Sequence, residues 1–280
     1  MSLRLCCSLF GISRQAYYQR LEREKAQFAQ LAQVKKMVVE QRMSMPRLGT
    51  RKLYFLLKDQ LHANHLKVGR DKLFYFLRSE HMLVKRRKSY TKTTMSKHWL
   101  HKHPNLVKGN IFKEPERLWV SDITYLKTKE GNSYLSLITD AYSRKIMGHH
   151  LSNDLRTEGV VEALKMAIKK RIYTHPLIHH SDRGLQYCSQ EYQLELASHH
   201  IQPSMTDGYD CYQNALAERI NGILKEEFLL QTYNTLEDAR KVIKQSIDIY
   251  NSKRPHLSLQ FKTPDFIHKN SPVLLTSGES

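Results

Sequence analysis

Hydrophobic residues recur along this chain with two different periods, and the change between them divides the sequence. Up to about residue 84 they recur every three or four positions, as in amphipathic helices that bury one face. From residue 114 onward, stretches that alternate every second position appear between helical stretches, which is typical of strands alternating with helices. The pattern therefore predicts small all-α domains followed by an α/β unit.

The first helical segment, residues 1–45, contains a helix, a short break and a second helix. Gly11 interrupts the helical pattern that runs from Leu3 to about Lys36, and Ser13 has the short polar side chain of an N-cap for the helix after the break. This arrangement is typical of a helix-turn-helix, although other two-helix connections share it. We predict a helix-turn-helix-like segment here.

The second helical segment, residues 46–84, carries two further amphipathic helices at residues 51–57 and 69–78. Their apolar faces predict a small core. Arg70 and Lys72 lie on the polar face of the second helix, where basic side chains can neutralise DNA phosphates. A solvated charged face explains the same residues, so both interpretations stay open.

A basic stretch, residues 85–113, follows the helical segments. It contains no acidic residue and has little apolar periodicity. A charged segment without a hydrophobic pattern is typical of a linker rather than of a folded domain. We expect this linker to contact a polyanion, mainly through its first four residues, Lys85, Arg86, Arg87 and Lys88.

The α/β unit is predicted to span residues 114–270, with a short tail at 271–280. Three strands joined by tight turns come first, followed by a helix, a fourth strand and mostly helix. This order predicts a mixed sheet of the ribonuclease-H-like kind. The predicted elements are strands at residues 118–126, 133–139 and 145–151, a helix at 156–171 and a strand that starts at Leu177.

Composition narrows the partners of this 280-residue chain. Lys and Arg number 45 against 27 Asp and Glu, a net charge of +18 that favours a polyanion such as nucleic acid. A membrane surface is the competing polyanion, but the sequence has no apolar run of about 18 residues and no signal-peptide core at its start. We therefore expect a cytoplasmic protein. The four cysteines lack the spacing of a disulfide or zinc framework, which indicates ordinary reduced thiols.

Two aspartates lie where phosphodiester chemistry needs carboxylates. Asp182 ends the apolar run that starts at Leu177, and ligands of α/β sheets bind at such strand ends. Asp122 lies within the first strand, which neighbours the fourth in this topology, so the two side chains can meet. Carboxylates suit a hard cation such as Mg²⁺. In the alternative interpretation, Asp182 caps the next helix and Gly184 only makes the turn.

A third acid is expected on a helix that crosses the same sheet edge. Residues 214–227 have a strong helical pattern. One face of that helix presents Asn214, Glu218, Gly222 and Lys225. Gly222 destabilises a helix relative to alanine, which indicates that a partner approaches closely there. An exposed polar face with a chance glycine is the alternative.

Four motifs in this order are similar to the signature of one family. They are Trp119-x-x-Asp122, His180-Ser-Asp182-x-Gly184, Asn214-Ala-x-x-Glu218-x-x-x-x-x-Leu224-Lys225-x-Glu227, and Tyr250-Asn251-x-x-Arg254-Pro255-His256-x-x-Leu259 with Thr263-Pro264. Through these motifs the chain resembles the DDE transposases of insertion sequences, in particular the second-frame product of the IS-three group, whose core is similar to retroviral integrases. The 35 residues between Asp182 and Glu218 fit the same pattern.

The resemblance implies a DNA transposase that uses Mg²⁺ for DNA strand cleavage and strand transfer, the steps of DNA integration. Asp122, Asp182 and Glu218 are the implied catalytic residues and the ligands of two Mg²⁺ ions, for which Mn²⁺ can substitute. Lys225 and Asn214 are the implied contacts to transposon-end DNA. The implied partners are the transposon ends, target DNA, a second copy of the chain as the minimum for a homo-oligomer, and an upstream-frame protein or fusion. The resemblance also implies a bacterial protein at the nucleoid.

Other acids and other functions compete with this interpretation. Asp140 is predicted in a hairpin turn, which is more typical of a structural acid, while Asp207 and Asp210 lie in a loop that borders the predicted site. Arg219 follows the glutamate where many members of the group have a smaller residue. One rival function is a catalytically silent DNA-binding regulator, which needs no acid triad. The other is a plain ribonuclease-H-type nuclease, which needs no helical DNA-binding segments.

Overall fold

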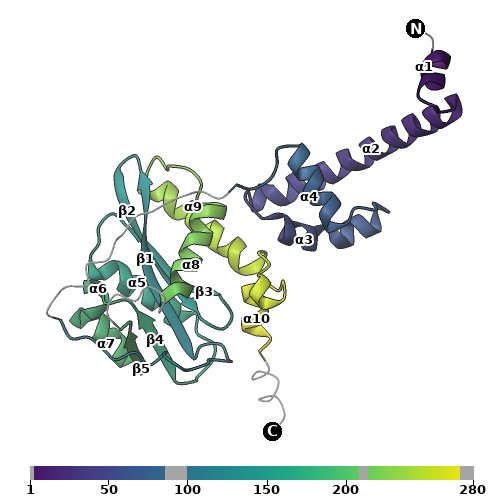
Figure 1. The fold of residues 1–280 in the computed structure, drawn as a ribbon. Coiled ribbons are helices and arrows are strands. Elements are labelled where there is room, and N and C mark those ends of the chain that lie inside the picture. The colour runs from purple at the N-terminus through teal and green to yellow at the C-terminus, as the bar shows by residue number, and fades with distance from the viewer. Residues whose placement is uncertain (1–2, 86–99, 208–213, 272–280) are drawn as a thin grey trace. The chain divides into compact units, whose positions relative to one another are not determined.

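The chain folds into two compact units that divide after Lys85 (Figure 1). Arg86, Arg87 and Lys88 of the predicted linker lie outside the residues that the structure describes. Within the described parts of the chain, no helix is both long and apolar enough to cross a membrane. The computed structural model describes residues 3–85, 100–207 and 214–271.

The N-terminal unit is built from helices. Ser13 caps the longest of them, because its side-chain oxygen accepts a hydrogen bond from the Ala16 backbone N–H at 3.0 Å. The predicted break at Gly11 and the predicted cap are thus confirmed. The capped helix runs on to Ser44, beyond its predicted end. The helices are α1 (Leu3–Leu9), α2 (Arg14–Ser44), α3 (Thr50–Ala63) and α4 (Arg70–Ser79).

Buried apolar residues of α2, α3 and α4 lie inside the N-terminal unit. Val34 and Val38 in the second half of α2 have no solvent exposure. Leu53 and Leu57 of α3 and Leu73 of α4 are equally buried. The two helical segments that we predicted separately therefore pack within a single compact unit.

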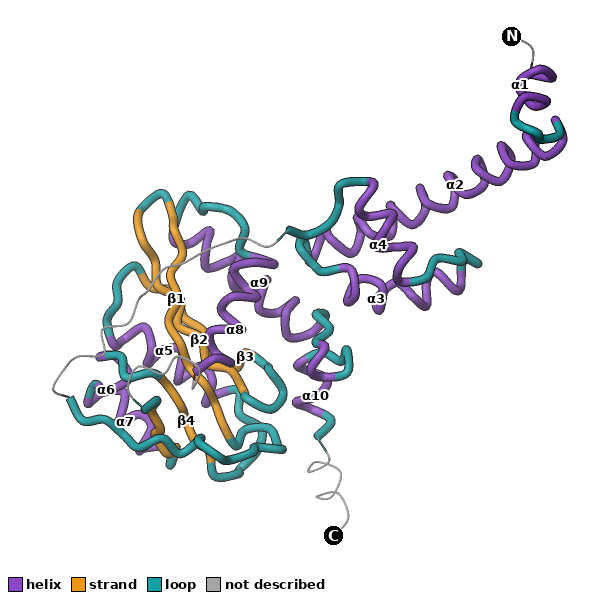
Figure 2. The backbone as a smooth tube through the Cα atoms, viewed as in Figure 1, coloured by secondary structure: helices purple, strands orange, loops and turns teal. Residues whose placement is uncertain are grey.

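A five-stranded mixed sheet forms the centre of the second unit (Figure 2). The strand order is β3-β2-β1-β4-β5, in which β1 pairs antiparallel with β2 and parallel with β4. The predicted ribonuclease-H-like order and the four predicted strands are confirmed. The strands are β1 (Leu118–Thr128), β2 (Gly131–Asp140), β3 (Ile146–Ser152), β4 (Leu177–Ser181) and β5 (Ile201–Met205).

The pattern of hydrophobic residues does not predict the fifth strand. This strand has only five residues and contains Pro203, which has no N–H to donate to a neighbouring strand. Proline is tolerated at the edge of a sheet, and among the strands that the structure describes β5 pairs with β4 alone. We predicted mostly helix after the strand that starts at Leu177. The structure has one additional edge strand there.

Helices cover both faces of the sheet (Figure 1). Alternation along β1 separates the two faces, because successive side chains of a strand point to opposite sides. Trp119 packs with residues of α5 and α7, whereas Val120 packs with Ala217 of α8. The helical elements are α5 (Thr157–Lys169), α6 (Leu185–Cys188), α7 (Gln190–Ser198), α8 (Ala215–Ile223), η2 (Leu224–Phe228), α9 (Leu236–Ser252), η3 (Leu257–Leu259) and α10 (Pro264–Lys269).

Part of the predicted linker packs on the second unit. Val107 and Phe112 lie in the hydrophobic cluster on the α8 side of the sheet. The Leu106 N–H donates a hydrogen bond to the side-chain oxygen of Ser204 in β5 at 2.9 Å. These residues therefore belong to the α/β unit that carries the predicted site.

Candidate active site

Asp122 and Asp182 occupy equivalent positions on two neighbouring parallel strands. The pairing between β1 and β4 ends at Val120 and His180, and each aspartate lies two residues farther along its strand direction. Because side chains alternate across a sheet, Asp122 lies on the face of Val120, which α8 covers. The structure thus confirms that the two strands are neighbours, and it brings both aspartates to one edge.

Two hydrogen bonds hold the Asp122 carboxylate. Its Oδ1 accepts from the Ile123 N–H at 2.9 Å, and its Oδ2 accepts from the Asn221 side-chain amide at 2.7 Å. Burial and the Asp182 charge raise the pKa of Asp122 to about 7; Glu218 adds to the rise, and the two hydrogen bonds oppose it. The Asp122 carboxyl therefore takes up and releases its proton near neutral pH.

Gly184 provides space next to Asp182 rather than an unusual backbone conformation. Its N–H donates to Asp182 Oδ1 at 3.0 Å, and its φ of −65° suits any residue. A Cβ atom at this position would lie 3.0 Å from the same carboxylate oxygen. The turn that the alternative interpretation assigns to Gly184 therefore does not need the conformational freedom of a glycine.

Glu218 lies in α8 and is exposed. Partial burial of its carboxyl on the side of the sheet and the Asp182 charge raise the pKa of Glu218, so the two carboxylates are within electrostatic reach of each other. Among the residues that the structure describes, no three His, Cys, Asp or Glu side chains are grouped closely enough to hold a metal ion. The three acids share one neighbourhood, and their joint ligation of a metal stays a prediction.

The helix that carries Glu218 changes its winding after Ile223. There α8 passes into the π-turn η2, in which the Leu229 N–H donates to the Leu224 carbonyl at 2.8 Å. We predicted one regular helix up to residue 227. This prediction is wrong for the last turn, where a π-turn accommodates an extra residue. Such turns occur frequently at functional sites.

Lys225 reaches from this π-turn back to β1. Its Nζ donates to Thr124 Oγ1 at 3.2 Å and lies 5.6 Å from the centre of the Tyr125 ring. Burial lowers the pKa of Lys225, while the charge of Asp122 raises it in part. The structure thus brings this cation close to the acids, and its contact with DNA stays a prediction.

Asn214, the other predicted DNA contact of this segment, is buried. Its side-chain amide donates to the Ser121 carbonyl at 2.9 Å, which fixes the start of α8 against β1. Gly222 differs, because apart from its chain neighbours and the backbone of its own helix no described atom lies within 4 Å of the place where a Cβ would stand. The predicted open spot on the helix is thus present, and DNA contact by Asn214 stays a prediction.

Sequence reasoning missed Asn221, which orients Asp122. Its side chain is buried, and its amide makes the 2.7 Å hydrogen bond to Asp122 Oδ2. Asn221 lies three residues after Glu218, a spacing that puts the two side chains on the same side of a helix. This spacing was the only signal in the sequence that pointed to it.

A buried network supports the two strands from the opposite face of the sheet. His179 Nε2 lies 2.6 Å from Ser121 Oγ and 2.9 Å from the Tyr192 hydroxyl. Burial lowers the pKa of His179 to about 3, so the ring is neutral and can accept hydrogen bonds at this nitrogen. The network ties β1, β4 and α7 together beneath the acids.

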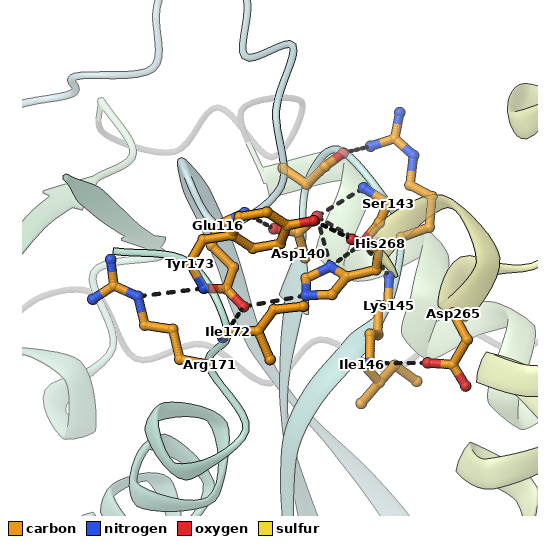
Figure 3. Close-up of polar contacts among 12 residues, drawn as sticks. Glu116, Asp140, Ser143, Lys145, Ile146, Arg171, Ile172, Tyr173, Asp265 and His268 are labelled. Carbon is orange, nitrogen blue, oxygen red and sulfur yellow. Dashed lines mark hydrogen bonds and ion pairs between the residues drawn. The ribbon is translucent and has the colours of Figure 1, made fainter. Parts of the chain in front are cut away.

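Asp140 belongs to a buried cluster of polar side chains, the Glu116 cluster, which also contains Glu116, Ser143 and His268 (Figure 3). Asp140 Oδ1 accepts from the Ser143 N–H at 2.7 Å, and its Oδ2 accepts from the Glu116 N–H at 2.6 Å. His268 of α10 completes the cluster, with Nε2 3.2 Å from Glu116 Oε1. The structure therefore supports a structural role for Asp140.

The other charged residues of interest are exposed or lie outside the described ranges. Asp207 is exposed, whereas Asp210 lies outside the described residues. Arg219 is exposed beside Glu218. In the N-terminal unit, the predicted DNA contacts Arg70, Lys72 and Lys85 are exposed, and Arg70 Nε lies 2.9 Å from Asp71 Oδ1. Their contact with DNA stays a prediction.

The chain is similar to known proteins in sequence and in fold. Two models of the Integrase core domain match residues 113–211 and 199–264. A 31 kDa protein of insertion element IS600 from Shigella sonnei is 33% identical over 258 residues, which cover 90% of this chain and 93% of that protein. The transposase of insertion sequence IS3A from Escherichia coli (strain K12) is 29% identical, with 81% of this chain and 79% of that protein covered. A similar fold occurs in a chain of the simian T-cell lymphotropic virus intasome in complex with the PP2A regulatory subunit B56 gamma. The TM-score is 0.50 and the identity 20%, and the match covers 82% of this chain and 73% of that chain.

Proposed function

Because this chain belongs to the insertion-sequence transposases of the IS-three group, we propose that Asp122, Asp182 and Glu218 are its catalytic residues. The protein is a DNA transposase with an integrase catalytic core, an enzyme that cleaves DNA and transfers the cut strand. One observation carries the assignment of residues. Carboxylates from β1, from the end of β4 and from α8 lie within electrostatic reach of one another, because burial first, then the Asp182 charge and least of all the Glu218 charge raise the pKa of Asp122 to about 7.

The donor set fits a divalent cation. Carboxylate oxygens are the ligands that hard cations prefer, and a cation among these acids would relieve the repulsion between them. We propose that Asp122, Asp182 and Glu218 hold two Mg²⁺ ions, for which Mn²⁺ can substitute. When bound, such ions activate the attacking oxygen of a phosphodiester transfer and stabilise the leaving oxygen.

Neighbouring groups of the chain prepare these carboxylates. The Asn221 amide orients Asp122 at 2.7 Å, and the Gly184 N–H orients Asp182 at 3.0 Å. Lys225 supplies a positive charge beside the acids, where it can attract a phosphate of the transposon end. Asp122 must lose its proton to bind a cation, so we expect cation affinity to fall as the pH falls below about 7.

DNA is the proposed partner of both units, in keeping with the net charge of +18. Joining two transposon ends to a target requires the ends to be held together, so we propose at least a dimer on DNA. An upstream-frame protein, separate or fused, is the further proposed partner, and the bacterial nucleoid in the cytoplasm is the proposed place of action. The proposed phosphate contacts, besides Lys225 and Asn214, are Arg70, Lys72, Lys85, Arg86, Arg87 and Lys88.

A strand-joining reaction with purified protein tests the assignment. A pre-cleaved transposon end is incubated with target DNA and Mg²⁺, and the joined product is measured. We expect Asp182→Asn to lose cleavage and joining while DNA binding stays largely intact, because binding rests on dispersed basic residues. Asp154→Asn is the control, since Asp154 is a partly exposed acid that pairs with Arg156 at 3.3 Å. Wild-type joining by Asp182→Asn would show that the metal assignment is wrong.

A further inference from the structure

Arg254, from the C-terminal motif, forms a buried two-pronged ion pair with Glu227. Its Nε lies 2.8 Å from Glu227 Oε2, and its Nη2 lies 2.6 Å from Glu227 Oε1. Only 2% of the arginine side chain and 16% of the glutamate side chain are exposed. Removing two charges from water is costly, so a buried pair adds little net stability compared with apolar packing. The pair therefore needs an explanation besides stability.

The glutamate of this pair lies in the π-turn η2, directly after the helix of the site. Glu227 follows Lys225 by two residues, a spacing at which the two side chains of a helical turn do not face each other. Lys225 leaves the same π-turn on the other side and donates to Thr124 Oγ1 at 3.2 Å. Arg254 thus holds the back of the π-turn, while Lys225 holds its front against β1.

The arginine is itself fixed by other residues of its motif. Its Nη1 lies 3.0 Å from His256 Nε2, and its guanidinium lies 5.7 Å from the centre of the Tyr250 ring. Asn251 hydrogen-bonds to both backbone groups of Ile146, at 2.9 Å and 3.0 Å, so α9 is attached to the edge of β3. The ion pair therefore connects the π-turn to the frame of the sheet.

We propose that Arg254 is a positioning residue of the active site, which acts through Glu227 to fix the π-turn and with it the directions of Glu218 and Lys225. The proposal rests on the proposed role of Glu218 as a metal ligand. Pi-turns are rare, so the contacts around this one determine where it forms. A two-pronged contact between arginine and a carboxylate suits this task, because it sets orientation as well as distance.

Loss of the pair is expected to loosen the site without removing any metal ligand. Substitution of residues that orient metal ligands typically lowers metal affinity or activity by about 10- to 100-fold. A role limited to stability predicts a different result, namely fewer folded molecules that each keep the normal metal affinity. Metal affinity of the folded protein therefore separates the two roles.

The experiment replaces both partners by uncharged side chains, E227M/R254M, in the full chain. Apolar replacement of a complete buried pair is often tolerated. K145M/D265M is the matched control, because Lys145 and Asp265 form a 3.0 Å ion pair that joins α10 to the start of β3. Binding of Mn²⁺ is measured by electron paramagnetic resonance of the free ion, and strand joining is titrated with Mg²⁺. We expect Mn²⁺ affinity to fall about 10-fold or more in E227M/R254M and to stay normal in the control.

Normal Mn²⁺ affinity in folded E227M/R254M would overturn the proposal. If that variant does not fold, Arg254→Lys decides, because lysine keeps the charge but loses the two-pronged contact. Normal Mn²⁺ affinity in Arg254→Lys would then overturn the proposal as well. Glu218→Gln tests the proposed function separately. If Glu218→Gln also binds Mn²⁺ normally, Glu218 is not a metal ligand, and the proposed function fails rather than the role of Arg254 alone.

Discussion

At the scale of single residues, Asp122 couples the stability of the metal-free protein to pH. Burial and the Asp182 charge raise the pKa of Asp122 from 3.8 to about 7, so in this range the folded state binds a proton that the unfolded chain releases. The contribution of Asp122 to stability is therefore fully present below pH 3.8 and is lost as the pH rises through 7. Above that pH the metal-free fold carries an unfavourable buried charge.

Asp122→Asn is expected to raise the melting temperature of the metal-free protein above pH 7, because a neutral amide is not repelled by Asp182. Each kcal/mol corresponds to about 2–4 °C in a unit of 150–250 residues, so a rise of several degrees is expected. Calorimetry on either side of pH 7 measures this effect, with Asp154→Asn as the control. A variant that melts no higher than the wild type above pH 7 would show that the ionised Asp122 carboxylate does not destabilise the fold.

Asn221→Ala is expected to weaken strand joining by about 10- to 100-fold, since it removes a side chain that orients a proposed metal ligand. The hydrogen bond from Asn221 lowers the pKa of Asp122, so its loss should raise that pKa further. The acidic limb of the pH profile of joining should therefore move to higher pH. Asn270→Ala is the control, because in the described part of the chain this amide donates to the Phe266 carbonyl, four residues away. An unshifted pH profile would argue against an influence of Asn221 on Asp122.

The places of the three acids in the fold could be predicted from the sequence because their signals are local, whereas their role rests on the family resemblance and stays a prediction. Asp182 ends an apolar strand, and Glu218 lies on a helix with a clear polar face. Asn221 is different, since its hydrogen bond to Asp122 joins positions 99 residues apart, and only the folded chain shows which carboxylate it meets.

At the scale of elements, β3 and α5 come into close contact at Gly148. A Cβ at this position would lie 2.0 Å from the Ala163 carbonyl oxygen, which cannot move without shifting the helix. Gly148→Ala is therefore expected to destabilise the protein by about 1–3 kcal/mol, the usual range for overpacking. Denaturant unfolding measures the change, and an unaltered midpoint would mean that the strand and the helix are less tightly packed than the structure indicates.

Gly222→Ala is expected to have the opposite effect on stability. In the described parts of the chain nothing lies within 4 Å of the added Cβ, and alanine favours a helix over glycine by about 0.8–1.0 kcal/mol. Strand joining should nevertheless fall, because the methyl group occupies space that we expect DNA to use. Unfolding and joining are measured on one preparation. A stabilised variant with full joining activity would exclude a close approach of DNA at Gly222.

The elements that the sequence predicts are those with a clear hydrophobic or amphipathic pattern between turn residues. Strands β1 to β4 and helix α5 have such patterns, and their predicted bounds lie close to the observed ones. The edge strand β5 escapes prediction because Pro203 interrupts its pattern. The π-turn escapes because its glutamate, Glu227, is held by Arg254, a partner 27 residues away.

At the scale of the whole molecule, the net charge of +18 dominates the expected binding of DNA. The logarithm of the binding constant should fall with the logarithm of salt concentration, with a slope of about −0.9 for each phosphate neutralised. We expect this chain alone to bind transposon-end and scrambled fragments similarly, and a fused upstream segment to add the preference. Competition binding at near-physiological salt compares both proteins. A preference of about 10³ or more from this chain alone would show that its own helices read the ends.

The Glu116 cluster sets an order of events during synthesis. Glu116 and His268 are separated by 152 residues, yet both side chains are buried in it. The α/β unit therefore cannot close until the ribosome has released the segment that forms α10, whereas the core of the N-terminal unit uses residues that are made much earlier. A growing chain thus gains its first helices well before it gains the ability to cut DNA.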